Sequence, residues 1–427
     1  MTPKGPKAEV YPKRRQRALA AMDQNSVLFI AGPAEAVYSN DVCYRYRPDT
    51  NIRYLTGYED PACLMLGAAG LTLFVEARDA ERERWTGPRL GPEGAAERYG
   101  AEQGLALDQW PAKLEEALGN AKVVYYDHSL DPYAEVRVRE LLSASGAPEL
   151  RPARELLGQL RVIKEEAEIR IMREAIRLSA QAHRSLAGLV RPGMSEYEAE
   201  AAIDHEFRRG GCAGPAYPTI AASGANATVL HYIRNDRTMN EGDLLLVDAG
   251  GEYGGYCADI TRTIPVGDSY SGPQREVYET VLTAQKSAID AVRPGVTYGE
   301  VHMQALASLV PAMIEIGLLE GSVDECMESR TYTDYYMHRT SHWLGMDVHD
   351  LGSYGQDGDR PLEPGMVLTV EPGIYVSEGA DCPEHLRGIG VRIEDDLLVT
   401  DNGAEVLSAV APKETAEIEE LRGRALA

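Results

Sequence analysis

The sequence predicts an α/β domain over residues 1–155, followed by an α+β domain over residues 156–427. Three observations lead to this prediction. The chain has 427 residues, enough for two domains that each bury a hydrophobic core. Strand-like and helix-like segments alternate in roughly the first 150 residues, and Arg151-Pro152 marks the end of that pattern. Beyond about residue 217, apolar strands separated by Gly and Pro turns dominate, which is typical of an α+β domain with a mixed or antiparallel sheet.

The first domain alternates short apolar runs with amphipathic stretches. The apolar runs predict buried strands at residues 27–32, 63–66, 71–75 and 122–126. The amphipathic stretches between them predict helices at residues 93–99 and 110–118.

The second domain opens with helices whose ends repeat. One long helix is expected from residue 156 to about residue 189, where Arg-Pro-Gly stops it. A second helix is expected over residues 195–209, because Ser195 and Glu198 form a capping-box pattern. After a predicted helix at residues 274–291, Arg-Pro-Gly recurs at residues 293–295, and Thr297 with Glu300 repeats the capping pattern before a helix to residue 316. The recurrence predicts an internal duplication of a helix and strand unit.

Charge, hydropathy and cysteine usage exclude several classes of protein. A formal net charge of −24 argues against nucleic-acid binding, which needs a basic surface. No segment approaches the roughly 18 apolar residues that span a membrane, and residues 1–10 lack the apolar segment of a secretory signal. The six cysteines show no CxxC or zinc spacing and are typical of reduced thiols. We therefore expect a cytoplasmic protein without nucleic-acid or membrane partners.

Four carboxylates lie in segments that otherwise look buried. Asp248 ends the run LLLV, Glu371 follows VLTV, and Asp259 and Glu394 lie in similarly apolar surroundings. Burying unpaired carboxylates is costly, so several together imply a compensating cation. His342 adds an imidazole nearby in the sequence, and oxygen ligands with one imidazole suit a pair of divalent metals. The sequence therefore predicts a two-metal hydrolase.

The glycine-rich segment between Asp248 and Asp259 predicts a β-hairpin. If its centre lies between Tyr253 and Gly254, Asp248 lies directly opposite Asp259, with Cβ atoms roughly 5 Å apart. A metal between them would turn their repulsion into coordination. The alternative is that Asp248 only caps a strand and Asp259 faces solvent.

Arginine and histidine residues complete the predicted site. Arg392 and Glu394 share one face of a strand, so Arg392 is expected to hold a carboxylate charged and oriented. Three histidines, at positions 338, 342 and 349, lie within a short segment that also contains a Trp and a Gly, and His231 follows an apolar pair. The HExxH motif of single-zinc proteases is absent from this segment.

With these residues assembled, the chain resembles aminopeptidase P, in the metallopeptidase group that also holds prolidase and methionine aminopeptidase. The matching stretches are LLVDAGGEYGGYCADITRT from residue 245, HRTSHWLGMDVHD from residue 338, EPGMVLTVEPGIY from residue 363 and GIGVRIED from residue 388. Residues 38–57 resemble the N-terminal domain of the same family. Arg339 stands where the family pattern has glycine.

The resemblance implies a creatinase-like N-terminal domain and a pita-bread catalytic domain. It implies that Asp248 binds one metal, that His342 and Glu371 bind the other, and that Asp259 and Glu394 bridge both. It also implies that His231, His338 and His349 face the substrate and that Arg392 supports the ligands. Tyr217 and Tyr375 match tyrosines of the substrate pocket and of the region near that arginine.

The resemblance also implies a reaction, its cofactors and its partners. The expected substrate is a peptide with proline as its second residue, cleaved before the proline. Glu371 would relay a proton from the attacking water to the proline nitrogen, while His231 and His349 donate hydrogen bonds to the carbonyl oxygen. Two divalent ions are expected, manganese first because of the oxygen-rich ligands, with zinc or cobalt as alternatives. The family also implies a homodimer or homotetramer.

Prolidase and, less favoured, a non-catalytic peptide-binding module are the alternatives, while creatinase is disfavoured. Prolidase, a strict Xaa-Pro dipeptidase, has the same five ligands. Creatinase shares the fold but lacks the metal carboxylates, all of which are present here. A non-catalytic peptide-binding module on the same fold would have lost its ligands.

Overall fold

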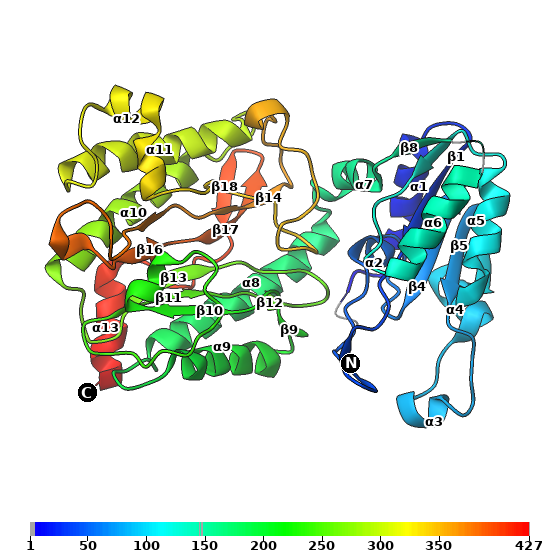
Figure 1. Ribbon diagram of the computed structural model, residues 1–427, viewed down its shortest axis with the longest axis horizontal. Coiled ribbons are helices and arrows are strands. Elements are labelled where there is room, and N and C mark those ends of the chain that lie inside the picture. The colour runs from blue at the N-terminus through cyan, green and yellow to red at the C-terminus, as the bar shows by residue number, and fades with distance from the viewer. Residues whose placement is uncertain (1–4, 145, 147, 427) are drawn as a thin grey trace. The chain divides into compact units, whose positions relative to one another are not determined.

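The computed structural model describes residues 5–144, 146 and 148–426 and forms two compact units, Met1–Arg161 and Val162–Ala427 (Figure 1). The expected boundary after residue 155 falls inside helix α7 (Ala153–Arg161), which belongs wholly to the first unit. The reason is the buried guanidinium of Arg161, which donates hydrogen bonds to Thr50 Oγ1 at 3.1 Å and Asn51 Oδ1 at 2.7 Å. These bonds tie the last turn of α7 to the first unit.

The first unit contains a six-stranded mixed sheet in the order β6-β5-β4-β1-β7-β8. Only β4 runs opposite to the other five strands, so their carboxyl ends lie along one edge. The four expected strands are present, with two more at the edges and a separate hairpin of β2 and β3. In chain order the strands are β1 (Ser26–Ala31), β2 (Val37–Ser39), β3 (Val42–Cys43), β4 (Ala62–Gly67), β5 (Gly70–Val75), β6 (Gln103–Ala106), β7 (Val123–Tyr125) and β8 (Glu149–Arg151).

Helices α5 and α6 cover one face of this sheet. Trp110 and Leu114 from α5 and Val138 from α6 pack with Phe29 of β1 and Phe74 of β5 in one buried cluster. The helices before α7 are α1 (Val10–Ala21), α2 (Thr50–Thr56), α3 (Glu83–Thr86), α4 (Gly91–Tyr99), α5 (Trp110–Leu118) and α6 (Pro132–Ala144). The α/β prediction for this domain is confirmed.

The second unit consists of helix pairs and short antiparallel sheets. Its three-stranded sheets have the orders β10-β11-β13 and β14-β17-β18, and the pairs β9-β12 and β15-β16 complete it. The strands are β9 (Gly214–Pro215), β10 (Ile220–Ser223), β11 (Leu244–Asp248), β12 (Gly251–Glu252), β13 (Thr261–Pro265), β14 (Val367–Val370), β15 (Gly373–Tyr375), β16 (Gly390–Arg392), β17 (Asp395–Thr400) and β18 (Gly403–Val406). The helices are α8 (Glu166–Ala187), α9 (Glu196–Gly210), α10 (Gly272–Ala291), α11 (Tyr298–Glu315), α12 (Val323–Ser329) and α13 (Thr415–Leu426).

The single helix expected from residue 156 to residue 189 is wrong, because the chain leaves the helical path between α7 and α8. Ile163 forms a β-bridge with Met366, and the Lys164 N–H donates to the Gly365 carbonyl at 2.8 Å. This pairing with a distant part of the chain overrides the local helical pattern.

The two Arg-Pro-Gly stops occupy equivalent places in the second unit. Gly193 N donates to Met239 O at 2.8 Å, and Gly295 N donates to Leu362 O at 2.9 Å. Both glycines have positive φ values, 84° and 86°, which favour glycine at a helix end. A helix and an antiparallel sheet follow each stop, so the structure agrees with the predicted duplication.

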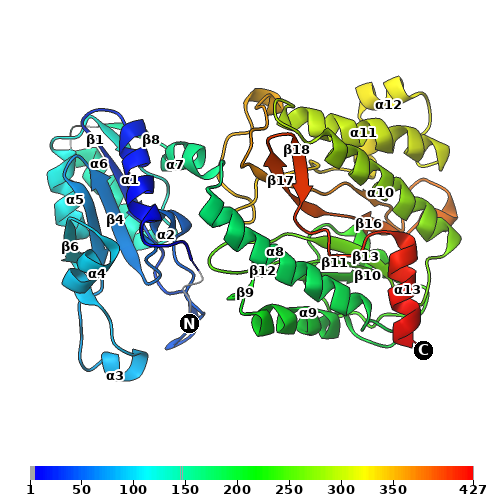
Figure 2. The ribbon, with the colours of Figure 1, turned by 180° about the vertical axis from the view of Figure 1, so that it is seen from behind.

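Helices α8, α10 and α13 cover one face of the strands in the second unit. They lie behind the strands in Figure 1 and in front of them in Figure 2. Buried residues of these helices, such as Leu186, Val281 and Ile418, form one core cluster with Leu245 and Val391 from the strands. Among the described residues, no helix is both long and apolar enough to cross a membrane.

Candidate metal centre

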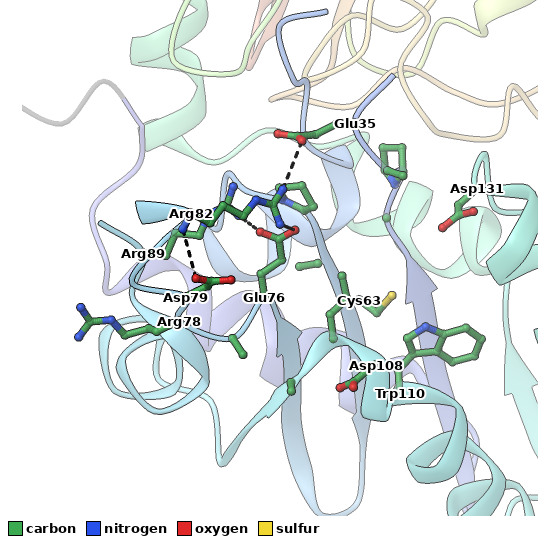
Figure 3. Close-up of a pocket in the computed structure, with 18 of the residues that line it drawn as sticks. Glu35, Cys63, Glu76, Arg78, Asp79, Arg82, Arg89, Asp108, Trp110 and Asp131 are labelled. Atoms are coloured by element: carbon green, nitrogen blue, oxygen red, sulfur yellow. Dashed lines mark hydrogen bonds and ion pairs between the residues drawn. The ribbon is translucent and has the colours of Figure 1, made fainter. Parts of the chain in front are cut away.

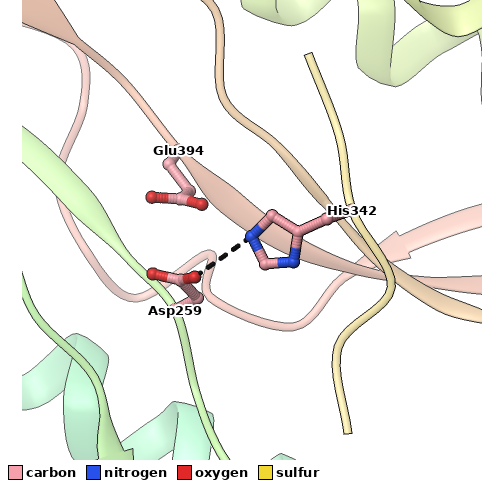
Figure 4. Close-up of side chains that lie close together, drawn as sticks. All are labelled: Asp259, His342 and Glu394. Atoms are coloured by element: carbon pink, nitrogen blue, oxygen red, sulfur yellow. Dashed lines mark ion pairs between the residues drawn. The ribbon is translucent and has the colours of Figure 1, made fainter. Parts of the chain in front are cut away.

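Each half of the second unit supplies two carboxylates at strand ends. Asp248 is the last residue of β11, and Asp259 lies just before β13. Glu371 directly follows β14, and Glu394 directly precedes β17. The ligand atoms of Asp259, His342 and Glu394 lie within 4.8 Å of one another (Figure 4). The structure therefore brings together three side chains that the sequence predicts as metal ligands.

The hairpin between the two aspartates turns one residue later than expected. Tyr253 and Tyr256 exchange backbone hydrogen bonds of 2.9 and 3.1 Å around Gly254 and Gly255. Both glycines have positive φ, as a two-residue type I′ turn requires.

This later turn changes the expected pairing of the aspartates. Asp248 pairs with Thr261, and the prediction that it lies directly opposite Asp259 is wrong. Because Asp259 and Thr261 are two residues apart, Asp259 becomes a diagonal neighbour of Asp248. The Tyr217 hydroxyl contacts both carboxylates, at 2.6 Å from Asp248 Oδ1 and within hydrogen-bonding distance of Asp259 Oδ1.

His342 presents Nε2 to the carboxylates. Its Nδ1 lies 3.0 Å from the Trp343 carbonyl oxygen, which can only accept, so Nδ1 carries a proton. Nε2 lies 3.2 Å from Asp259 Oδ2 and 3.5 Å from Glu371 Oε1. The backbone beside β14 fixes the residue, because Thr369 N donates to the His342 carbonyl at 3.0 Å. A carbonyl partner on the far nitrogen is the usual arrangement of a metal-binding histidine.

Arg392 pairs with Asp248. Its Nη2 lies 2.5 Å from Asp248 Oδ2, its Nε donates to Thr261 Oγ1 at 3.1 Å, and its Nη1 donates to the Tyr375 hydroxyl at 3.0 Å. The carboxylate that Arg392 holds is therefore Asp248. Glu394 instead accepts a hydrogen bond from the Thr261 hydroxyl at 2.6 Å.

The positive groups of the protein do not balance the negative charge of these carboxylates. Burial raises the pKa of Glu371 to about 7, although the nearby His342 opposes the shift. Burial, with the charge of neighbouring carboxylates, also raises the pKa of Asp259 and that of Glu394. Burial lowers the pKa of His342, but its hydrogen bond with Asp259 and the charge of Glu371 outweigh this and raise it to about 9.

Divalent cations fit this arrangement of charges. Among the described residues, Arg392 is the only arginine or lysine paired with any of the four carboxylates. Four carboxylates and one guanidinium leave an excess of negative charge that two divalent ions would neutralise. The mixture of oxygen donors with one imidazole is also suitable for them.

A cavity of about 280 Å³ opens onto these ligands. His231 and His349 line it and are exposed to solvent, and His338 lines it while donating or accepting a hydrogen bond with the Tyr375 hydroxyl at 2.8 Å. Arg339 also lines it. The described lining includes neither Tyr217 nor Tyr375, which lie against ligands and their supports instead of in the cavity.

Two further residues that support the ligands were missed from the sequence. The Thr261 hydroxyl donates a hydrogen bond to Glu394 and accepts one from Arg392. Asp396 Oδ2 accepts a hydrogen bond from the Asp259 N–H at 3.1 Å. Thr261 and Asp396 each lie two residues after a predicted ligand, the spacing of residues on one strand face. That spacing was the available signal.

Comparisons with known proteins agree with both units. Residues 170–401 match the family model of metallopeptidase family M24, and residues 11–125 match that of the aminopeptidase P N-terminal domain. The chain is 42% identical to an Xaa-Pro aminopeptidase of Haemophilus influenzae, with 97% of each chain covered. It is 40% identical to the Xaa-Pro aminopeptidase of Escherichia coli, over 96% of this chain and 97% of that protein.

Solved structures give the same relationship. Zinc-substituted E. coli aminopeptidase P in complex with product superimposes with a TM-score of 0.93 at 39% identity, covering 99% of both chains. Proline aminopeptidase P II from Yersinia pestis gives a TM-score of 0.93 at 40% identity, covering 98% of this chain and 99% of the other.

Proposed function

This chain belongs to metallopeptidase family M24, with the N-terminal domain of aminopeptidase P, and from this membership we propose how its residues carry out Xaa-Pro aminopeptidase activity. The reaction is metal-dependent hydrolysis of the bond between an N-terminal residue and a following proline. The observation that carries the proposal is the meeting of Asp259, His342 and Glu394 beside Asp248 and Glu371, at the base of a histidine-lined cavity.

Five side chains would hold two divalent metal ions. Asp248 would help to hold one ion, His342 and Glu371 would help to hold the other, and Asp259 and Glu394 would contribute to both. When bound, the ions supply Lewis acidity that makes a water molecule nucleophilic near neutral pH. Tyr217 and Arg392 orient Asp248 through the contacts described above.

The remaining steps depend on side chains of the cavity. The Glu371 carboxylate accepts a proton from the attacking water and delivers it to the proline nitrogen. His231 and His349, which line the cavity, donate hydrogen bonds to the carbonyl oxygen as negative charge develops there. His338 and Tyr375 form a hydrogen-bonded pair beside Glu371, with His338 Nδ1 3.7 Å from Glu371 Oε2.

Proline as the second residue suits a dedicated enzyme. The bond before proline is a tertiary amide without an N–H, so strand-like recognition of the substrate backbone is lost. A cavity of about 280 Å³ accommodates only a small part of a peptide around the scissile bond.

The deciding experiment compares an Xaa-Pro dipeptide with an Xaa-Pro-Xaa tripeptide in the presence of manganese. We expect turnover of the tripeptide; activity restricted to dipeptides would instead support a prolidase. Asp259→Asn is the control for the metal assignment, and we expect it to lose activity with both substrates. Full activity of Asp259→Asn would refute the ligand set.

We further propose manganese as the native metal, cytoplasmic location and a homodimer or homotetramer. Oxygen-rich ligation supports manganese over zinc or cobalt. Metal analysis of protein purified without chelators or added metal tests the first point. Light scattering at several protein concentrations tests the assembly, and a monomer at all of them would contradict it.

A further inference from the structure

A buried carboxylate at the start of α9 lies outside the metal centre. Glu196 is the first residue of this helix and is fully buried, and no arginine, lysine or histidine pairs with it within the part of the chain that the structure describes. Its two oxygens instead accept hydrogen bonds. Oε1 accepts from the Ser223 N–H at 2.7 Å, the Ser223 hydroxyl at 2.7 Å and the Asn226 amide at 3.1 Å, and Oε2 accepts from the Tyr232 hydroxyl at 2.8 Å and the Arg237 N–H at 2.9 Å. These hydrogen bonds offset the cost of burying a carboxylate.

All of these donors belong to one segment, residues 223–237. The segment begins where β10 ends, passes through the short helix η2 (Gly224–Thr228) and later crosses residues 232–237, which form no helix or strand. A carboxylate that accepts from the beginning, middle and end of such a segment replaces hydrogen bonds that regular secondary structure would supply. Glu196 therefore fixes the course of the segment.

This segment carries His231 to the cavity at the metal centre. The His231 ring lines the cavity, is exposed and has no hydrogen bond to any residue that the structure describes. Its position consequently depends on its two neighbours in the chain. Leu230 and Tyr232 pack against a buried cluster that includes Leu246. Tyr232 also reaches Glu196, so the hydrogen bond between these two side chains is the polar anchor next to His231.

The Tyr232 hydroxyl is the donor in this hydrogen bond. Burial raises the pKa of Tyr232 to about 12, and its hydrogen bond with Glu196 adds to the shift, so the hydroxyl remains protonated near neutral pH. A second acceptor, Oδ1 of the exposed Asp236, lies farther away at 3.3 Å. The hydroxyl therefore donates to Glu196, the nearer and more deeply buried acceptor.

The far end of the segment has a separate anchor. Buried Asn235 donates to the Thr219 carbonyl at 2.8 Å and accepts from the Ala221 N–H at 3.0 Å. Neither of these hydrogen bonds involves Glu196. Loss of the Tyr232 hydroxyl should therefore loosen the part of the segment near the cavity without unfolding the rest.

We propose that Glu196 is a positioning residue for the peptidase reaction, because its hydrogen bond with Tyr232 holds His231 where it can donate to the substrate carbonyl oxygen. The proposal rests on the role of His231 in the proposed function. Neither Glu196 nor Tyr232 has a hydrogen bond to a proposed metal ligand among the described residues. Loss of their hydrogen bond should consequently weaken the stabilisation of charge in the transition state and leave metal binding unchanged.

Tyr232→Phe removes the hydroxyl and keeps the ring that packs on the core. We expect kcat for an Xaa-Pro-Xaa tripeptide to fall roughly tenfold, with KM and metal content after dialysis unchanged, because the lost interaction acts only in the transition state. Glu196→Gln should lower kcat at least as far, since a single amide oxygen cannot accept all of the hydrogen bonds that the carboxylate accepts.

Tyr197→Phe is the matched control. Tyr197 is the next residue of α9 after Glu196, is exposed, and its hydroxyl makes no hydrogen bond to the residues that the structure describes. We expect this variant to keep the kcat of the unaltered protein.

A double variant separates positioning from a general loss of structure. His231→Ala should lower kcat, and adding Tyr232→Phe to it should lower kcat no further, because the group that Tyr232 positions is already absent. A purely structural role of Tyr232 would instead lower kcat by the same factor with either residue at position 231.

Three results would overturn the role of Glu196 alone. They are an unchanged kcat in Tyr232→Phe, the same fold loss from Tyr232→Phe with histidine or alanine at position 231, and a loss of bound metal in Tyr232→Phe. Full kcat in His231→Ala is a separate outcome, because it would refute the role of His231 in the proposed function and, with it, that of Glu196.

Discussion

At the residue scale, Arg392 illustrates how one buried cation organises an acidic centre. Its three nitrogens contact Asp248, Thr261 and Tyr375, so that one planar group fixes side chains from three strands. A lysine would supply the charge but could not reach these partners with the same fork geometry. The role of Arg392 is therefore positional, because it acts through Asp248, a proposed ligand.

Arg392→Lys should lower both metal affinity and kcat by roughly 10–100-fold, the usual effect of losing an outer-shell partner. The measurement is metal content after dialysis, combined with kcat at saturating metal. Arg387→Lys, an exposed arginine whose contact is a carbonyl, serves as the control and should leave both unchanged. Unaltered metal content in Arg392→Lys would contradict the positional role.

Arg339 is a second residue whose charge has a specific consequence. It lines the small cavity, is exposed, and has no carboxylate partner among the described residues. We expect Arg339→Gly to raise KM several-fold for a tripeptide with a free carboxyl terminus, because the substrate's carboxylate loses the attraction of the Arg339 guanidinium. The amidated tripeptide should be affected less. An equal change in KM for both peptides would show that Arg339 does not recognise the carboxylate.

Buried His183 predicts a pH-dependent contribution to stability. Burial lowers its pKa to about 4, although its hydrogen bond to the Ala249 carbonyl, 2.9 Å from Nε2, opposes the shift. In the unfolded chain the His183 imidazole is protonated near pH 6.5. The stability that comes from keeping His183 neutral is therefore present above pH 6.5 and is lost as the pH falls towards 4. His183→Gln should remove about 3 kcal/mol of this acid-dependent loss. Urea unfolding of both proteins at several pH values between 4 and 8 measures it, and parallel pH profiles would refute it.

At the element scale, the hairpin between β11 and β13 determines where Asp259 lies. Its two central residues are Gly254 and Gly255, with φ values of 60° and 86°. The Gly-Gly pair fixes the register in which Asp248 pairs with Thr261, so both aspartates contact Tyr217. The type I′ turn thus determines which side chains meet at the candidate metal centre.

Replacing both turn glycines with alanine should destabilise the hairpin by about 1–3 kcal/mol, because a Cβ is strained at positive φ. We expect a lower melting temperature and weaker metal binding, measured by calorimetry and metal titration. Gly272→Ala is the matched control: Gly272 begins α10, has ordinary φ and leaves open space for a Cβ. A melting temperature as low in Gly272→Ala as in the turn variant would remove the link to positive φ.

At the scale of the whole molecule, the sequence was most informative where local chemistry was unusual. Carboxylates in apolar strands stand out without any structure, so Asp248, Asp259, Glu371 and Glu394 could be predicted as ligands from the sequence alone, and the structure groups Asp259 and Glu394 with His342. The helix break near Lys164 was not found, because it depends on pairing with Gly365, about two hundred residues away. The Asp248 partner of Arg392 was missed for the same reason. A cavity of about 1020 Å³ in the first unit was also invisible, since its walls come from the ends of several strands (Figure 3).

The separate cores of the two units predict an uneven response to metal removal. Phe29 and Trp110 belong to a core of the first unit. The proposed carboxylate ligands lie beside strands of the second unit, which has cores of its own. Metal bound only to the folded second unit stabilises it by about 2.7 kcal/mol when free metal is 100-fold above Kd. Chelation should therefore lower the melting temperature of the second unit by several degrees and leave the first unchanged. Calorimetry with and without EDTA measures this. Fluorine NMR of protein labelled with 5-fluorotryptophan assigns each transition, because Trp110 lies in the first unit and Trp343 in the second. If both signals report the same change in melting temperature on chelation, the metal stabilises the two units as one cooperative whole.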